Sequence, residues 1–324
     1  MQQPSSSEQK DKDGYKQTQM NMKRIIIILI AAAAALQSYA QVSDFSRRYD
    51  ALVSRNGLAG VGVETLLDRW KAADSTDVKM LTGRFNYYFF KAQSTEVVAK
   101  DQKKYLGMEP VLTLADSTGK NVHYYQISVF DDELYVKAME EVDKAVRIYP
   151  DMLDFRFFKA NAYVAYEKES PDMALSYLLG LVSEFASHSG EWTYDGEKAD
   201  AKFFQEAMQE YCVTFYTIGS PASLDAFLSL AKRMNQLYPD NPAFLTDIGS
   251  YYMQAKGDCK TALKYYAKAL KKDGSDYTAI KNAAIAARKL KKTSQEKKYL
   301  KMLIEKGPEH EKPAAQARLN ALQK

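Results

Sequence analysis

Cysteine, histidine and proline are scarce in this chain, whose 324 residues include two Cys, three His and nine Pro. Small secreted domains held together by several disulfides need more than two cysteines, so that class is excluded. Zinc sites with an established ligand spacing combine several Cys and His residues, whereas His123, His188 and His310 lie in three separate regions. The chain is 46% hydrophobic and 27% charged, which is typical of a folded protein with an ordinary core.

Catalytic signatures are absent as well. The sequence contains no G-x-S-x-G, H-E-x-x-H, phosphate-binding P-loop or C-x-x-C pattern. His188, Glu191 and Asp195 are metal-ligating types on one short stretch, but their spacing matches no established metal signature. We therefore predict no catalytic residue, no metal and no cofactor. An enzyme with catalytic residues scattered along the chain is the third alternative for function.

The N-terminal part has the pattern of an export signal. Lys23 and Arg24 precede residues 25–36, twelve positions without a charge, and the small residues Ser38 and Ala40 follow. This order predicts a secretory signal peptide cleaved after Ala40, and hence a periplasmic or secreted protein. Twelve apolar residues fall short of the roughly 20 that span a bilayer, so we expect no transmembrane span in the mature chain. Membrane anchoring by an uncleaved segment 25–36 is the alternative.

The two cysteines are expected to be buried free thiols. Cys212 lies within a predicted helix, and Cys259 lies near the start of another. Free cysteine behaves as a small apolar residue and is often buried. A disulfide between the two is the alternative, because an oxidising compartment would permit one.

Residues 241–292 contain two helical stripes separated by a tight break. Gly257 stands at the break, where a helix end favours a residue that tolerates positive φ, and Asp258 is suited to cap the next helix. The stripes recur at three- and four-residue steps, which places them on one face of each helix. They consist of Leu245, Ile248, Gly249 and Tyr252, and then of Ala262, Tyr266, Ala269 and Leu270.

The second stripe has counterparts elsewhere in the chain. A small residue, Ala262, is followed four, seven and twelve positions later by Tyr266, Ala269 and Gly274. Similar sets start at Ala138, Ala174, Ala226 and Glu296, so the starting positions lie 36, 52, 36 and 34 residues apart. The pattern resembles the tetratricopeptide repeat (TPR), a helix pair with a period of about 34 residues. The resemblance implies an all-α, right-handed α-α superhelix of about five helix pairs; an irregular helical bundle is the alternative.

The predicted organisation follows from these stripes. Residues 1–40 form an extension and signal peptide, 41–62 a short helix and a join, and 63–324 the TPR-like domain. The predicted helix pairs are 77–91 with 132–149, 151–168 with 171–187, 201–216 with 222–237, the two helices of 241–272, and the two of 277–306. Residues 312–322 resemble the polar helix that closes many TPR arrays.

An insertion interrupts the first predicted pair at residues 93–130. Residues 110–115 alternate weakly, 116–120 have the composition of a turn, and 122–130 are rich in β-branched and aromatic residues, which predicts a β-hairpin. Either the hairpin covers the apolar end of the first pair, or it contacts a partner. Its candidate contact residues are His123 and Tyr125. The stretch 188–200 adds Trp192 and Tyr194, either exposed or folded back on the helices.

The TPR resemblance also implies a binding groove lined by the first helix of each pair. Lys281 with Asn282 is a partial match to the residues with which some TPR domains bind a terminal carboxylate, but Ser250 and Ile285 depart from that pattern. The predicted groove residues, each with exposure to water alone as the alternative, are Thr246, Ser250, Met253, Lys281, Ile285 and Arg288.

Charge is distributed unevenly along the chain. Residues 256–306 contain 15 Lys or Arg and 5 Asp or Glu, a balance of +10, so the rest of the +4 chain carries −6. We expect a noncatalytic scaffold that binds a protein or peptide in the bacterial cell envelope. The alternative is an accessory protein that binds an anionic polymer or surface glycan through the basic C-terminal half. Nucleic acid is not expected as a partner, and peripheral contact with a membrane is a further alternative.

Overall fold

The computed structural model of the chain describes residues 44–188 and 190–322. The predicted signal peptide lies outside these residues. The described part is mostly helical and divides into two compact units. The first contains the described residues up to Ala92 together with Asp132–Ile148, and the second contains Gln93–Asp131 and the described residues from Tyr149 onward. No helix in the described part is both long enough and apolar enough to cross a membrane.

The first unit is a group of helices around Trp70. It comprises helical residues 44–56, α2 (Val63–Ala73), α3 (Val78–Lys91) and α4 (Asp132–Ile148). Trp70 is fully buried, with the rings of Phe45 and Tyr49 both 6.1 Å from its ring. Helix α3 begins at Val78 because the Asp77 side chain accepts a hydrogen bond from the Met80 N–H. Helix α3 packs against α4, which confirms the first predicted pair.

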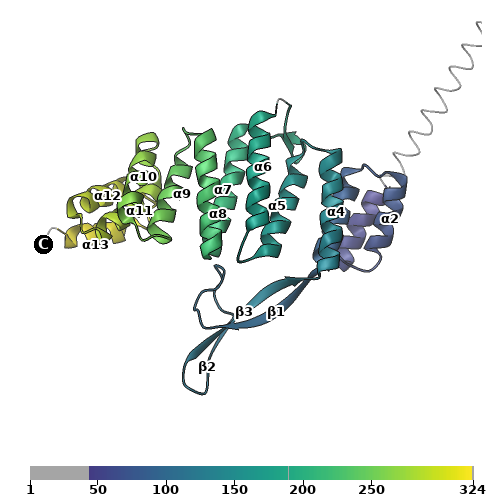
Figure 1. The fold of residues 1–324 in the computed structure, drawn as a ribbon, viewed down its shortest axis with the longest axis horizontal. Coiled ribbons are helices and arrows are strands. Elements are labelled where there is room, and N and C mark those ends of the chain that lie inside the picture. Colours follow the sequence, from purple (N-terminus) through teal and green to yellow (C-terminus); the bar gives the residue numbers. More distant parts are fainter. Residues whose placement is uncertain (1–43, 189, 323–324) are drawn as a thin grey trace, which may run out of the picture. The chain divides into compact units, whose positions relative to one another are not determined.

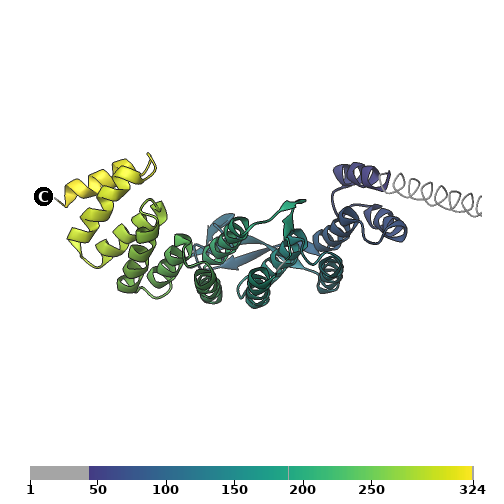
Figure 2. The same cartoon turned by 90° about the horizontal axis from the view of Figure 1, so that it is seen from above.

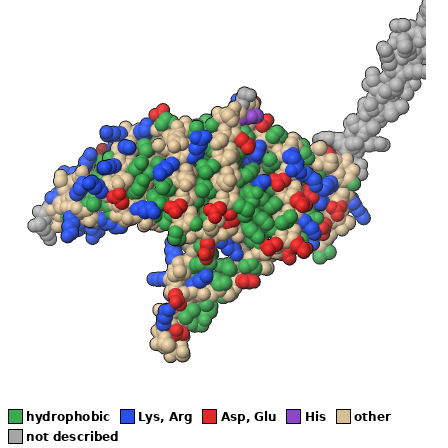
Figure 3. Space-filling model, in the orientation of Figure 1, with side chains coloured by type: hydrophobic (Ala, Val, Ile, Leu, Met, Phe, Trp, Pro, Cys, Tyr) green, Lys and Arg blue, Asp and Glu red, His purple; other side chains and the backbone are tan. Residues whose placement is uncertain are grey.

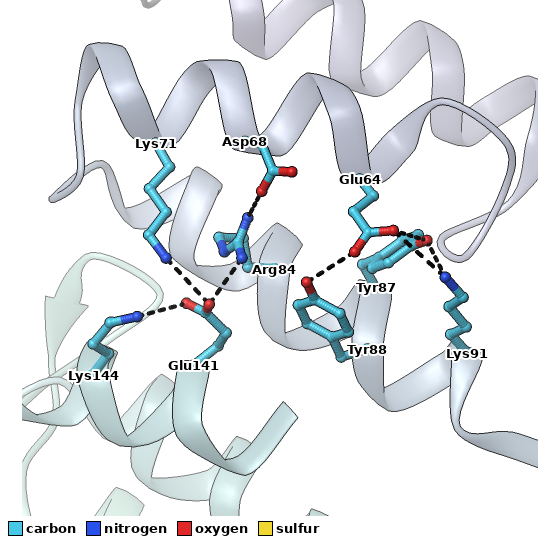
Figure 4. Close-up of polar contacts among 9 residues, drawn as sticks. All are labelled: Glu64, Asp68, Lys71, Arg84, Tyr87, Tyr88, Lys91, Glu141 and Lys144. Atoms are coloured by element: carbon cyan, nitrogen blue, oxygen red, sulfur yellow. Dashed lines mark hydrogen bonds and ion pairs between the residues drawn. The ribbon is translucent and has the colours of Figure 1, made fainter. Parts of the chain in front are cut away.

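An ion network around the buried pair Arg84 and Glu141 joins helices α2, α3 and α4 of this unit (Figure 4). Glu141 on α4 accepts from Arg84 on α3 at 2.9 Å and from Lys71 on α2 at 3.3 Å, and Lys144 lies 3.6 Å away. The second arm of the Arg84 guanidinium lies 2.5 Å from Asp68. Burial alone would raise the pKa of Glu141, but the three cations outweigh burial and lower it. Glu141 is therefore held charged inside the unit.

The second unit begins with an antiparallel sheet of three strands in the order β1-β3-β2, in which β1 is Gln93–Lys100, β2 is Leu112–Ala115 and β3 is Asn121–Phe130 (Figure 1). Strands β2 and β3 form the predicted hairpin, whose turn is held by the Asp116 side chain accepting from the Thr118 and Lys120 N–H groups. Strand β1 was not predicted, because its residues QSTEVVAK lack a clear alternation and pair with β3 across a long loop. The insertion is thus a three-stranded sheet rather than a hairpin alone.

Nine helices of the second unit follow one another in chain order within the described residues (Figures 1 and 2). Contacts join each predicted pair and also α8 to α9, α10 to α11 and α12 to α13. Between α6 and α7 the chain forms the small hairpin β4 (Thr193–Tyr194) and β5 (Glu197–Lys198), and α6 packs against α8. The helices are α5 (Leu153–Glu167), α6 (Asp172–Ser187), α7 (Ala201–Ile218), α8 (Pro221–Leu237), α9 (Pro242–Gln254), α10 (Cys259–Lys272), α11 (Tyr277–Lys289), α12 (Thr293–Lys306) and α13 (Lys312–Ala321).

Side-chain caps set the starts of five of these helices. Each capping oxygen accepts a backbone N–H of the first turn, which would otherwise lack an intrahelical partner. The capping residues are Asp200, Ser220, Asn241, Asp258 and Asp276. Cys212 and Cys259 are buried and free, which confirms that prediction.

The closest helix contact in the predicted repeat joins α9 to α10. A Cβ added to Gly249 would lie 2.6 Å from a ring carbon of Tyr266, and Tyr266 is fully buried. The Tyr266 hydroxyl donates to Ser250 Oγ at 3.3 Å. Only glycine lets the backbone of α9 approach the ring this closely.

Replacing Gly249 with alanine therefore tests the packing. Alanine favours helix by about 1 kcal/mol, but the added methyl clashes with a fixed ring, and overpacking costs about 1–3 kcal/mol. We expect Gly249→Ala to lower the free energy of unfolding. Gly180 on α6 has open space around it, so Gly180→Ala should raise that free energy by up to about 1 kcal/mol. Urea denaturation of both variants checks the pair, and stabilisation by Gly249→Ala would contradict this packing.

The ion network gives a second prediction. Glu141→Gln leaves the Arg84 guanidinium buried with Asp68 alone, and loss of one partner of a buried pair costs about 3 kcal/mol or more. Because the pKa of Glu141 is lowered in the fold, its contribution is present at neutral pH and is lost as pH falls through that pKa. Glu140→Gln, an exposed neighbour on α4, should change stability by less than about 0.5 kcal/mol. Thermal unfolding at neutral pH compares them; equal stability of the two variants would show that the network contributes nothing.

Candidate interaction surface

One face of the inserted sheet carries a group of exposed apolar side chains, next to the exposed polar side chain of Gln126. Strand register places Ala99 and Leu112 on either side of Tyr124, and Leu114 opposite Val122. Alternate residues of a strand share a face, so Val97 joins this group. Exposed fractions are 64% for Val97, 50% for Leu112 and 49% for Leu114. We call the apolar sheet face the residues Val97, Ala99, Leu112, Leu114, Val122 and Tyr124; hydrophobic side chains over the sheet are visible in Figure 3.

The opposite face of the sheet carries both predicted contact residues of the insertion. His123 and Tyr125 alternate along β3 and therefore point the same way, as expected. The Tyr125 ring is buried beside Tyr105, and its hydroxyl donates to the Gln102 carbonyl at 2.5 Å. The His123 ring lies 2.8 Å from the Thr113 hydroxyl. Tyr125 is thus part of the structure that supports the sheet, and its role toward a partner stays a prediction.

The loop between β1 and β2 anchors the sheet to the helices of the second unit. Gly107 has a φ of 78°, and a Cβ there would lie 2.4 Å from the Thr217 carbonyl oxygen, so the two backbones are in direct contact. The Tyr105 hydroxyl donates to Glu169 at 2.6 Å; burial and this carboxylate raise the pKa of Tyr105 to about 12. Ser220, the cap of α8, donates to the Glu169 carbonyl. These contacts fix the base of the sheet.

A polar pocket of about 590 Å³ lies at this base. It is bounded by the loop, by the end of α7 and the start of α8, and by Gln254 on α9. Within the pocket the Tyr105 hydroxyl and the Glu169 carboxylate are bound to each other. The lining residues outside the α7–α8 turn are Gln102, Lys104, Tyr105, Leu106, Gly107, Glu169 and Gln254.

Two of the predicted groove residues are buried between helices. The Thr246 hydroxyl donates to Asp276 at 2.7 Å. The Ser250 hydroxyl donates to the Thr246 carbonyl at 3.0 Å and lies 3.3 Å from both Tyr266 and Asn282, which donate to it. Both hydroxyls are therefore bonded inside the protein, because α10 and the start of α11 pack against this side of α9.

The other four groove residues are less enclosed. Met253 is half-buried beside Tyr266. Lys281 is also half-buried, and its ammonium lies 2.5 Å from Glu311. Ile285 and Arg288 are exposed. The partner-binding role of the six residues stays a prediction, for which Ile285 and Arg288 offer the most surface.

Trp192 and Tyr194 have different environments in the stretch before α7. Trp192 is buried and stacks on Phe185 at 5.5 Å, so it is folded back on the helices, one of the two predicted alternatives. Tyr194 is exposed on one side and contacts Phe157 and Phe203 on the other. Tyr194 is therefore the residue of the two that a partner could reach.

The three residues singled out as metal-ligating types in that stretch contact different groups. The His188 ring lies 3.1 Å from Asp151, the Glu191 carboxylate pairs with Lys198, and the backbone N–H of Asp195 donates to Asp154. Within the described residues no three His, Cys, Asp or Glu side chains are grouped so as to hold a metal ion.

A buried carboxyl that no sequence motif indicated lies between α7 and α9. Gln209 donates to Asp247 Oδ1 at 3.1 Å, while Asp247 Oδ2 and Gln209 Oε1 are buried without a hydrogen-bond partner in the described structure. Burial raises the pKa of Asp247 to about 7, and nearby Asp276 acts in the same direction. Burial also raises the pKa of the Cys212 thiol, next to this carboxyl.

Comparison with known proteins adds no relative: no family model matches the chain, and no curated protein matches it.

The Asp247 carboxyl makes stability depend on pH. Between its unfolded pKa, near 3.8, and its folded pKa, about 7, Asp247 is protonated in the folded state and ionised in the unfolded state. The free energy of unfolding should therefore fall as pH rises through that range and level off above it. The fall is up to about 1.4 kcal/mol per pH unit. Asp247→Asn keeps a neutral donor and acceptor and should remove this slope. Urea denaturation from pH 5 to pH 8, with Asp240→Asn on an exposed aspartate as control, measures it; identical slopes for the wild type and Asp247→Asn would refute the assignment.

Proposed function

We propose that the protein is a noncatalytic scaffold of the TPR type that holds a protein partner on the apolar sheet face. The observation that carries the proposal is the exposure of aliphatic side chains on the two outer strands of one sheet face: Val97 on β1, and Leu112 and Leu114 on β2. Soluble proteins rarely leave a contiguous apolar patch uncovered, and patches of this kind commonly mark binding sites.

Anchoring of the sheet supports this use. Tyr125 and Tyr105 cover one face, and the contact of Gly107 with Thr217 holds the loop against α7. The opposite face is thereby presented on a fixed support. Association with a rigid surface costs less ordering entropy than association with a mobile one.

A right-handed superhelix is the arrangement that we propose for α5–α13. It is supported by the packing of successive helices, by the Gly249–Tyr266 contact at repeat positions, and by the final helix α13. A repeat scaffold of this kind presents surfaces for binding without needing a catalytic centre.

The predicted signal peptide places this activity in the bacterial cell envelope or outside the cell. A protein or peptide of that compartment is the expected partner. The exposed residues Ile285 and Arg288 on α11 provide a second contact region that follows from the TPR resemblance.

Photo-crosslinking in cells tests the proposal. A photoreactive amino acid at Leu112 should capture one recurring protein, whereas the same residue at Val213, an exposed apolar position on α7, should not. Introducing Val97→Thr, Leu112→Thr and Leu114→Thr with the probe at Val122 should lower the captured amount by about tenfold, because the apolar contact area is lost while strand propensity is kept.

Further arms of this experiment separate the alternatives. The free energy of unfolding of the triple threonine variant should lie within about 0.5 kcal/mol of the wild-type value, since the three replaced side chains are exposed. A probe at Ile285 reports on the groove. Capture at Ile285 but not at Leu112 would mean that the partner binds at α11 and not at the sheet. Capture at neither position would refute the scaffold proposal.

A further inference from the structure

Lysines of the C-terminal helices lie on the protein surface without acidic partners. Of the 15 Lys and Arg in residues 256–306, ion pairs with described residues are formed by Lys272 with Asp240 and by Lys281 with Glu311, which leaves thirteen without one. Figure 3 shows Lys and Arg side chains outnumbering Asp and Glu toward the C-terminal end of the second unit. Charge of one sign is thus concentrated there.

The five acids of the same segment are mostly bound to the protein itself. Asp258 caps α10, and Asp276 caps α11. Asp273 accepts from the N–H and the hydroxyl of Ser275, and Glu296 is buried with Arg318 at 2.7 Å. Glu305 alone has no such partner among the described residues. These contacts hold the carboxylates in place, and five of them against fifteen basic side chains leave the segment with a balance of +10 and a positive potential over its surface.

The lysines form stripes on two helices. Lys260, Lys264, Lys268 and Lys271 recur at three- and four-residue steps along α10, and all are exposed. On α12 a shallow depression is lined by Thr293, Ser294, Lys297, Lys298 and Lys301. A second depression, between the start of α9 and the end of α10, includes Lys268, Lys271 and Lys272.

We infer that the exposed lysines of α10 and those of α12 bind an extended anionic polysaccharide. Fourteen of the fifteen basic residues are lysine, a hydrated point charge on a flexible stem that lacks the bidentate geometry of arginine. Cores of protein interfaces are depleted in lysine and enriched in aromatic residues and arginine. The surface thus suits a flexible chain of repeated negative charge better than it suits a folded protein.

Single-stranded nucleic acid is a poorer match than a polysaccharide. Proteins that bind it without sequence preference combine a basic groove with aromatic rings on which the bases stack. Within residues 256–306, all of them described, Ile285 is the only large apolar side chain that is exposed, and every tyrosine is at least partly buried. The inference does not depend on the sheet, which lies elsewhere in the sequence and has a different chemistry.

Binding of the full chain to dextran sulfate, measured by fluorescence anisotropy, tests the inference. The variant Lys297→Glu, Lys298→Glu, Lys301→Glu should bind about tenfold more weakly near 50 mM salt. The slope of log affinity against log salt should be smaller in magnitude by about 3, because three positive charges are lost. The control Lys103→Glu, Lys202→Glu, Lys232→Glu carries the same change in net charge on exposed lysines outside the segment. Its affinity should fall by less than about threefold.

The remaining arms separate the partners. The threonine variant of the apolar sheet face should bind dextran sulfate as the wild type does, so failure of the scaffold proposal leaves this result unaffected. Equal losses in the two lysine variants, or no binding near 50 mM salt, would overturn the inference. Tighter binding of single-stranded DNA or of polyglutamate than of dextran sulfate would also overturn it, and would assign these lysines to nucleic acid or to an acidic polypeptide.

Discussion

Burial of one helix against the next is the constraint on which the second unit depends. No helix of this length hides its apolar stripe by itself, and the stripe of α10 is covered because Gly249 lets α9 approach the Tyr266 ring. The same approach encloses Ser250 and Thr246, whose hydroxyls then bond to groups inside the protein. Tight packing between helices thus decides which polar side chains remain available to a partner.

The inserted sheet shows the complementary case, in which packing covers only one side. Tyr125 and Tyr105 fill the covered face, while no described element covers Val97 and Leu114 on the other. An apolar face that stays in contact with water lowers solubility and adds no stability. Its presence on a well-anchored support is therefore more readily explained by binding than by folding.

Acidic side chains contribute to this protein mainly through internal contacts. Glu141 holds Arg84 and Lys71 within the first unit, and Asp258 and Asp276 cap helices of the second. The basic character of the C-terminal helices follows from their composition, with fifteen Lys or Arg against five Asp or Glu in residues 256–306.

Local signals in the sequence determined the helices, their caps and the β2–β3 hairpin, because each depends on residues a few positions apart. Asp258 indicates the start of α10 in this way, and Gly257 indicates the end of α9. Strand β1 required pairing with β3 over more than twenty residues, for which a single sequence carries no readable signal.

Side-chain environments were decided by the tertiary structure in the same manner. Thr246 and Ser250 are buried by the approach of a neighbouring helix, Trp192 folds back on Phe185, and Asp247 lies beside Gln209. Helical periodicity gives the face on which a residue lies, but only the packing of distant segments determines whether that face meets water or another helix.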